Sequence, residues 1–170
     1  MDENANILDV AHLVVLAASQ KGIGVTPLKL QKLLYYLQAW NLVFFNNPIF
    51  QDEPEAWVNG PVYRKVYDHY RDYQMYEFIK ISPEEKQHID ERVVEIVRAI
   101  GFDASQQELF DEIISKYGKM ASADLGLRTH SEDPWKDARK GLGIFDYSTN
   151  VITHESMAKY YCSLLNKKNQ

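Results

Sequence analysis

The sequence predicts a mainly α-helical fold with a small two- or three-stranded β element. Apolar residues recur at helical spacing through most of the chain, and residues that start or end helices stand between these stretches. Two short stretches, around Trp57 and from Ile144 to Ile152, are instead rich in β-branched and aromatic residues, which favour strands. The chain shows no repeat, low-complexity tract or long linker, so residues 1–170 are expected to form one compact domain.

Two helices are expected in the first part of the chain. The first covers Ile7 to Lys21 and is ended by the glycines of Gly22-Ile23-Gly24. Thr26-Pro27 begins the second, because threonine can cap a helix and proline fits its first turn. That helix extends from Leu28 to about Phe45. Its apolar residues occupy more than one side, so it is expected to be the central helix.

Asn46-Asn47-Pro48 is expected to end the central helix, and the segment after it lacks helical spacing. Residues Ile49 to Asn59 read as a loop and a short strand around Trp57. Gly60-Pro61 is then expected to begin a third helix that continues through Tyr70. Such a helix would leave its N-terminus open at Pro61, able to accept an anion or a carbonyl group.

The second half of the chain contains several further start and stop signals for helices. We expect a helix from Ser82 to about Ile100, and then a helix with a Ser105–Glu108 capping box that ends at Tyr117. Short helices are expected over Ala121–Thr129 and from Asp133 to Lys140. A strand within Ile144–Ile152 is expected to pair with the Trp57 strand, and a final helix capped by Thr153 is expected to reach about Leu165.

The composition is ordinary for a globular protein and gives little support to a nucleic-acid partner. A net charge of −5 and a pI near 5.5 supply no excess of Lys and Arg for phosphate contacts. Cys162 is the single cysteine, so no intramolecular disulfide can form. The polar start of the chain is unlike a secretory signal, and the longest apolar stretch, Leu13 to Ala18, is too short to span a bilayer. A cytoplasmic protein without a membrane partner is expected.

The sequence contains no pattern typical of a catalytic, metal or cofactor site. The histidines show neither HxxxH nor HExxH spacing, and a lone Cys162 cannot complete the usual zinc sites. The glycine pairs match neither a Walker A motif nor a dinucleotide-binding motif. We therefore predict a protein that is not an enzyme and has no cofactor, no metal and no catalytic residue. One alternative stays open, a general base formed by His130 with Glu132 or by His69 with Asp68.

Tyrosine is more informative, because 11 tyrosines are many for this length. Tyr63, Tyr67 and Tyr70 recur at the spacing of one helical face, and Tyr73 follows. A tyrosine has a large apolar body and a polar tip, which suits half-buried cores and protein interfaces alike. Core packing is the default for a stripe at this spacing. The tyrosines that the core does not use are candidates for a partner-binding surface.

Three separated sequence blocks together resemble the signature of the Panacea domain, the family of the SocA antitoxin and of phage-associated GepA-like proteins. The first is Leu30–Tyr36, the second Glu55–Val62 and the third Thr129–Trp135. Their order and rough spacing agree with the family. The residues that carry the resemblance, as framework or as partner contacts, are Gln31, Lys32, Tyr35, Trp57, Gly60, Pro61, Thr129, His130, Pro134 and Trp135.

The resemblance implies a largely helical antitoxin of a toxin–antitoxin system, which neutralises a cognate toxin by direct binding. The toxin is expected to be encoded by an adjacent gene. SocA itself delivers its toxin to a ClpXP-type protease, so a proteolytic adaptor is an alternative, as is a phage or mobile-element regulator of a host protein. The family has no established catalytic residues to carry over. The residues around Trp57 and Trp135 are also explained as rigid corners of the fold.

Overall fold

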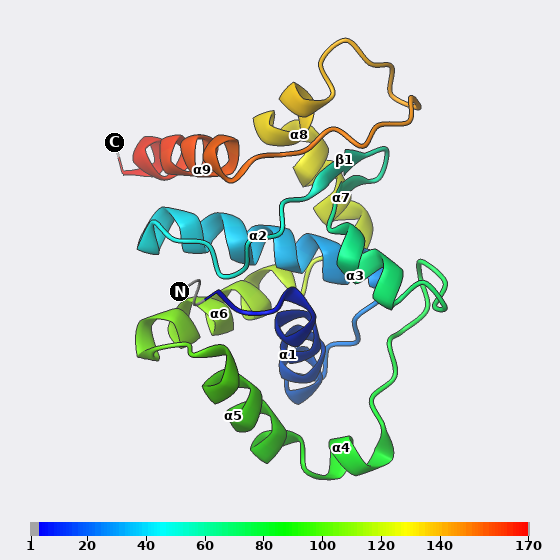
Figure 1. Cartoon of the computed structure of the whole chain (residues 1–170), viewed down its shortest axis with the longest axis vertical. Coiled ribbons are helices and arrows are strands. Elements are labelled where there is room, and N and C mark those ends of the chain that lie inside the picture. Colours follow the sequence, from blue (N-terminus) through cyan, green and yellow to red (C-terminus); the bar gives the residue numbers. More distant parts are fainter. Residues whose placement is uncertain (1–3, 170) are drawn as a thin grey trace.

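The computed structural model describes residues 4–169, and it confirms a mainly α-helical fold with a small antiparallel sheet. The long helix α2 (Pro27–Phe45) runs through the middle of the molecule. Helix α9 (His154–Lys168) lies on one side of α2, and α6 (Ala104–Tyr117) lies on the other (Figure 1). Helix α1 (Ile7–Gln20) packs against α2 and against α5 (Ile89–Ile100).

Helix α2 is central because its whole middle is buried, as its apolar pattern predicted. Every residue from 30 to 42 is buried, polar ones included. The buried amides tie the following segment back to the helix. Gln38 donates to the Phe50 carbonyl at 2.6 Å and accepts from the Ile49 N–H at 2.8 Å, and Asn41 donates to the Asn47 carbonyl at 2.6 Å. The buried amides of Gln38 and Asn41 thereby gain hydrogen-bond partners in place of water.

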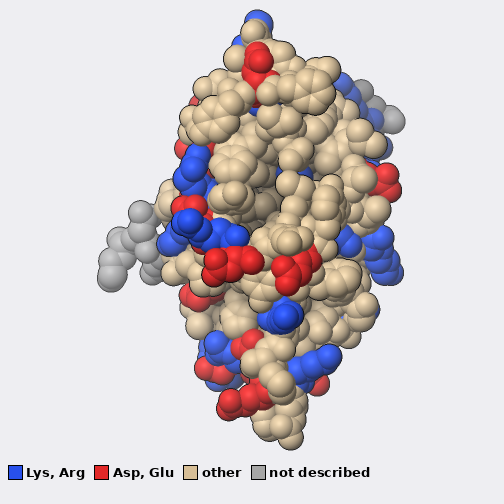
Figure 2. Space-filling view, turned by 90° about the vertical axis from the view of Figure 1, so that its right-hand side faces the viewer, with Lys and Arg blue, Asp and Glu red and all other residues tan. Residues whose placement is uncertain are grey.

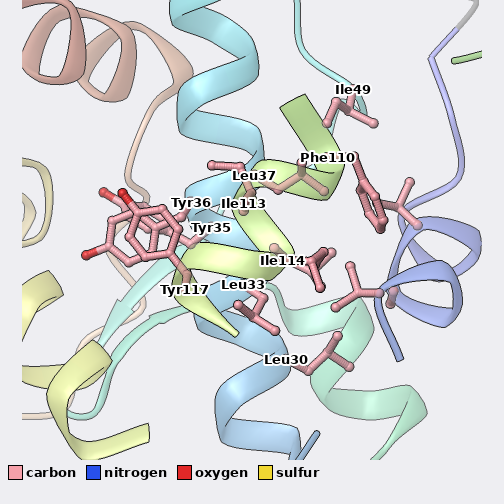
Figure 3. Close-up of a cluster of buried hydrophobic side chains, with 14 of the residues drawn as sticks. Leu30, Leu33, Tyr35, Tyr36, Leu37, Ile49, Phe110, Ile113, Ile114 and Tyr117 are labelled. Carbon is pink, nitrogen blue, oxygen red and sulfur yellow. The ribbon is translucent and has the colours of Figure 1, made fainter. Parts of the chain in front are cut away.

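The core beside α2 is built with α6 and α1. Figure 3 shows Leu33, Leu37 and Tyr36 of α2 facing side chains of α6. The rings of Tyr36 and Tyr117 stack at a centroid distance of 4.5 Å. The Trp40 indole N–H donates to the Tyr117 hydroxyl at 2.9 Å. These buried aromatic contacts fix α6 against α2 in one register.

The remaining helices are short. They are α3 (Arg64–His69), α4 (Pro83–Gln87), α7 (Ser122–Ser131) and α8 (Asp133–Ala138). Two expectations were wrong here. The helix that starts at Ser82 is interrupted at His88, so α4 and α5 are separate. The capping box of α6 is formed by Asp103 and Gln106, not by Ser105 and Glu108, because both reciprocal hydrogen bonds form two residues earlier.

The β element is a hairpin of β1 (Glu55–Trp57) and β2 (Gly60–Val62), paired antiparallel with Trp57 opposite Gly60. The prediction of a third helix starting at Gly60-Pro61 was therefore wrong, and no helix N-terminus opens at Pro61. Gly60, the first residue of β2, has a φ of +113° directly after the two-residue turn, a backbone conformation that glycine adopts easily. The helix begins only after Tyr63.

The expected strand within Ile144–Ile152 was correct only at its end. Val151 forms a single bridge with Glu55, and the flanking backbone groups bond to Ala56 and Pro54 at 2.8 Å. Residues 144–150 form a loop instead. Figure 2 shows the side of the molecule at the right of Figure 1, where this loop, the hairpin turn and the segment after α3 lie. Uncharged side chains surround a hollow near its middle. No helix of residues 4–169 has the length and apolar character that crossing a membrane requires.

Candidate functional site

The three sequence blocks meet at one buried point, which we call the signature junction: Lys32, Gly60, Pro61 and Thr129. Lys32 is fully buried, and its Nζ donates to the Pro61 carbonyl at 3.2 Å. A Cβ at Gly60 would lie 2.5 Å from that Nζ and 3.0 Å from the Thr129 hydroxyl oxygen. The glycine is needed for this close approach as well as for its backbone angle. Burial lowers the pKa of Lys32 from 10.5 to about 7.

The hairpin is held to α2 by a second contact of the first block. The Gln31 side chain accepts from the Tyr63 N–H at 2.8 Å and donates to the Tyr63 carbonyl at 3.2 Å. This pair of bonds replaces a strand partner for Tyr63, at the point where β2 turns into α3. Tyr63 itself is 1% exposed and packs edge-on against Phe50. The structure therefore places Tyr63 in the core and not on a partner-binding surface.

The third block closes on the second through its histidine and tryptophan. The His130 ring stacks on Trp135 at a centroid distance of 4.1 Å, and the Trp135 indole N–H donates to the Trp57 carbonyl at 2.8 Å. Pro134 between them is buried. Burial, followed by the positive charges of Lys32 and Arg139, lowers the pKa of His130. The stacked His130 and Trp135 rings pack the corner between α7 and α8.

Glu132 is a buried carboxylate that connects three helices. It accepts hydrogen bonds from the hydroxyls of Tyr36 at 2.5 Å and Tyr161 at 3.0 Å, and Tyr161 donates to Tyr35 at 3.2 Å. Burial raises the pKa of Glu132. The sequence suggested Glu132 as the carboxylate of a His130 general base, but its bonds go to the tyrosines. The other pair suggested, His69 and Asp68, is exposed, and the His69 ring lies against Tyr70.

Arg139 is a functional candidate that the sequence reasoning missed. It is buried, and its guanidinium lies 5.1 Å from the centroid of the Trp135 ring. One arm donates to the Ala56 carbonyl at 3.0 Å, and the other donates to the carbonyls of Gly143 at 3.0 Å and Asp146 at 2.7 Å. The available signal was its position four residues after Trp135, one helical turn away. Arg139 thus fastens the loop after α8 to the signature blocks.

The loop fastened by Arg139 displays large apolar side chains. Ile144 is 76% exposed, Phe145 87% and Tyr147 77%. The Arg139 guanidinium bonds to backbone carbonyls of this loop, and the three apolar side chains face the solvent. Contiguous exposed apolar patches are typical of interaction sites on protein surfaces.

Three of the four candidate tyrosines lie beside the hairpin. Tyr67, Tyr70 and Tyr73 line a pocket of about 300 Å³ that Trp57 also lines. The rings of Trp57 and Tyr67 are 4.9 Å apart and edge-on. A second hollow of about 120 Å³ lies on the other side of the hairpin turn, between Trp57 and Tyr147. We call the surface that joins them the aromatic face: Trp57, Asn59, Tyr67, Tyr70, Tyr73, and the loop residues Ile144, Phe145 and Tyr147.

Replacing Arg139 with methionine is expected to make chymotrypsin cut the loop after Phe145 or Tyr147 at least about tenfold faster. A hydrogen bond to a charged group contributes about 1.5–3 kcal/mol, which is about one or two powers of ten in local opening. Limited proteolysis followed by mass spectrometry measures the rate. Lys140→Met is the control, because Lys140 is the exposed neighbour. Equal rates in the two variants would show that Arg139 does not hold the loop.

The fold and the site define a mainly helical protein whose three sequence blocks form a buried polar junction beside an exposed aromatic face. Residues 30–136 match the family model described as "Antitoxin SocA-like, Panacea domain". The match covers more than half of the chain and includes all three blocks, so the chain belongs to this antitoxin family. The loop that displays Phe145 lies outside the matched segment, beyond the end of α8. Comparisons with curated proteins and with solved structures gave no match.

Proposed function

We propose that this protein neutralises a toxin in the cytoplasm by binding it directly and in stoichiometric amount, without catalysis. The observation that carries the proposal is the family match over residues 30–136, because a SocA-like antitoxin has a toxin as its general partner. The proposed toxin is the product of a neighbouring gene. In this mechanism the protein binds the toxin without nucleic acid, a membrane, a metal or a cofactor.

The geometry supports a binding role over a catalytic one. The buried polar side chains at and beside the signature junction bind the backbone of the fold itself: Lys32 bonds to Pro61, Gln31 to Tyr63, and Arg139 to the loop. These side chains therefore hold the hairpin, α2 and the loop together. Several side chains of the aromatic face are instead exposed to solvent: Tyr67, Ile144, Phe145 and Tyr147. The net charge of −5 would also speed the encounter with a basic toxin.

Co-expression tests the proposal. The product of the neighbouring reading frame is expected to stop growth when induced alone, and this protein is expected to restore growth and to co-purify with it. The half-life of the toxin is expected to stay the same or to lengthen, since a bound protein is protected. A shortened half-life that depends on a ClpXP-type protease would contradict direct neutralisation and favour an adaptor. A neighbouring product that is neither toxic nor bound would contradict the proposal as a whole.

A further inference from the structure

We propose that the toxin docks on the aromatic face and inserts one aromatic or branched aliphatic side chain, flanked by a carboxylate, into the pocket below Trp57. This inference rests on the proposed function, and it names the surface and the chemistry of the contact. Three features of the face support it: the walls of the pocket, the loop that borders it and the single charge at its rim.

The pocket has the walls of an anchor site. Its volume of about 300 Å³ is enough for one large side chain, and Trp57, Tyr67 and Tyr70 form much of its lining. Tyrosine and tryptophan give large contact areas with little loss of side-chain freedom, and binding energy concentrates in pockets of this kind. The amide of Gln31 also reaches the pocket, but both of its ends already bond to Tyr63. The apolar walls therefore call for an apolar occupant.

The loop extends the same surface and is held in place before any partner arrives. Trp57 and Asn59 line both the pocket and the hollow beside Tyr147, so the two depressions are neighbours at the hairpin turn. Arg139 holds the loop from below through the carbonyls of Gly143 and Asp146. A surface that is already ordered loses less entropy on binding. Phe145, the most exposed of these side chains, is expected to contact the toxin outside the pocket.

The charge at the rim specifies what flanks the anchor. Arg71 is the charged residue that lines the pocket, and no carboxylate lines it. Within residues 4–169 the Arg71 guanidinium has neither an ion-pair nor a hydrogen-bond partner. By contrast, Arg64, which lies over the Trp57 ring, is paired with Glu55 at 2.9 Å. An unpaired guanidinium beside an apolar pocket suits a partner that places Asp or Glu next to its anchor side chain.

The test uses three variants in the full chain, with the neighbouring gene product as the probe. Phe145→Ser and Tyr67→Ala are each expected to weaken its binding about 30-fold or more, as the loss of an interface anchor does. Arg71→Glu is expected to weaken binding about tenfold, mainly through slower association. The matched controls are Leu127→Ser on α7 and Arg98→Glu on α5, which remove an exposed apolar side chain and reverse an exposed charge away from the face.

Calorimetry measures binding of each variant to the gene product, and growth rescue measures neutralisation. Sedimentation of the protein without its partner measures self-association. Weaker binding in the three variants, with the controls unchanged, supports the docking face. Wild-type binding in all three variants, while the unaltered protein neutralises the toxin, overturns the docking face and leaves the proposed function standing. Failure of the unaltered protein to bind the product rejects the proposed function and the docking face together. Self-association that Phe145→Ser abolishes would place a second copy on the face and would also overturn the inference. Arg71 is exposed, so its variant remains informative even where another fails to fold.

Discussion

Replacing Gly60 with alanine is expected to lower the free energy of unfolding by roughly 2–4 kcal/mol. Two costs combine at this position. The φ of +113° is one that residues with a Cβ rarely adopt. The added Cβ would also lie 2.5 Å from the Nζ of Lys32, so the fully buried lysine side chain would have to shift. Urea unfolding monitored by circular dichroism measures the change.

Gly22→Ala separates the two costs. Gly22 has a φ of +72°, but nothing lies within 4 Å of the position that its Cβ would occupy. Its variant is expected to lose only the conformational part, about 1 kcal/mol. An equal loss in the two variants would show that the close approach of Lys32 and Gly60 contributes nothing, and the signature junction would then be a backbone turn alone.

The stability of the protein is expected to rise by roughly 2 kcal/mol between pH 7 and pH 9 because of Lys32. The pKa of this lysine is about 7 in the folded protein and 10.5 in the unfolded chain. Between these values the unfolded state carries the proton and the folded state does not, so stability increases with pH. The gain is complete above the unfolded pKa and is lost as the pH falls through about 7.

Urea unfolding at half-unit steps from pH 7 to pH 9 measures the slope of the unfolding free energy against pH. The variant Lys32→Met is expected to remove this slope. Methionine is similar in length and can occupy the same buried channel without a charge. Lys136→Met is the control, because Lys136 is exposed and its removal should leave the slope unchanged. A slope that persists in Lys32→Met would assign the titration to another group. The upper limit of pH 9 lies below the pKa at which the tyrosines ionise, and burial raises the pKa of several of them further.

The helices could be predicted from the sequence wherever periodicity and caps agree. The wide apolar pattern of residues 30–42 identified α2 as central, and Thr26, Ser82 and Thr153 cap their helices as expected. The hairpin could not be predicted, because Gly60-Pro61 also reads as the start of a helix. Which reading holds depends on Lys32 and Gln31, which reach the hairpin from α2. Such distant contacts leave no periodic pattern in the sequence.

The candidate site was only partly predictable. The three blocks identified the junction because they contain the residues that meet there. Helical spacing grouped Tyr63 with Tyr67 and Tyr70, but Tyr63 precedes α3 and points into the core. Arg139 and Phe145 were missed for a different reason. A buried arginine that bonds to carbonyls and an exposed phenylalanine both look ordinary in a sequence, and only the fold shows that one supports the other.

Titration of the purified toxin with the purified protein tests direct neutralisation most directly, with toxin activity as the readout and no other component present. We expect inhibition that rises linearly and becomes complete at an equimolar ratio, with the toxin recovered intact. Complete inhibition at a small fraction of an equivalent would mean turnover and would contradict a non-enzymatic antitoxin. Binding without inhibition until a protease is added would also contradict the account, because the protein would then be an adaptor.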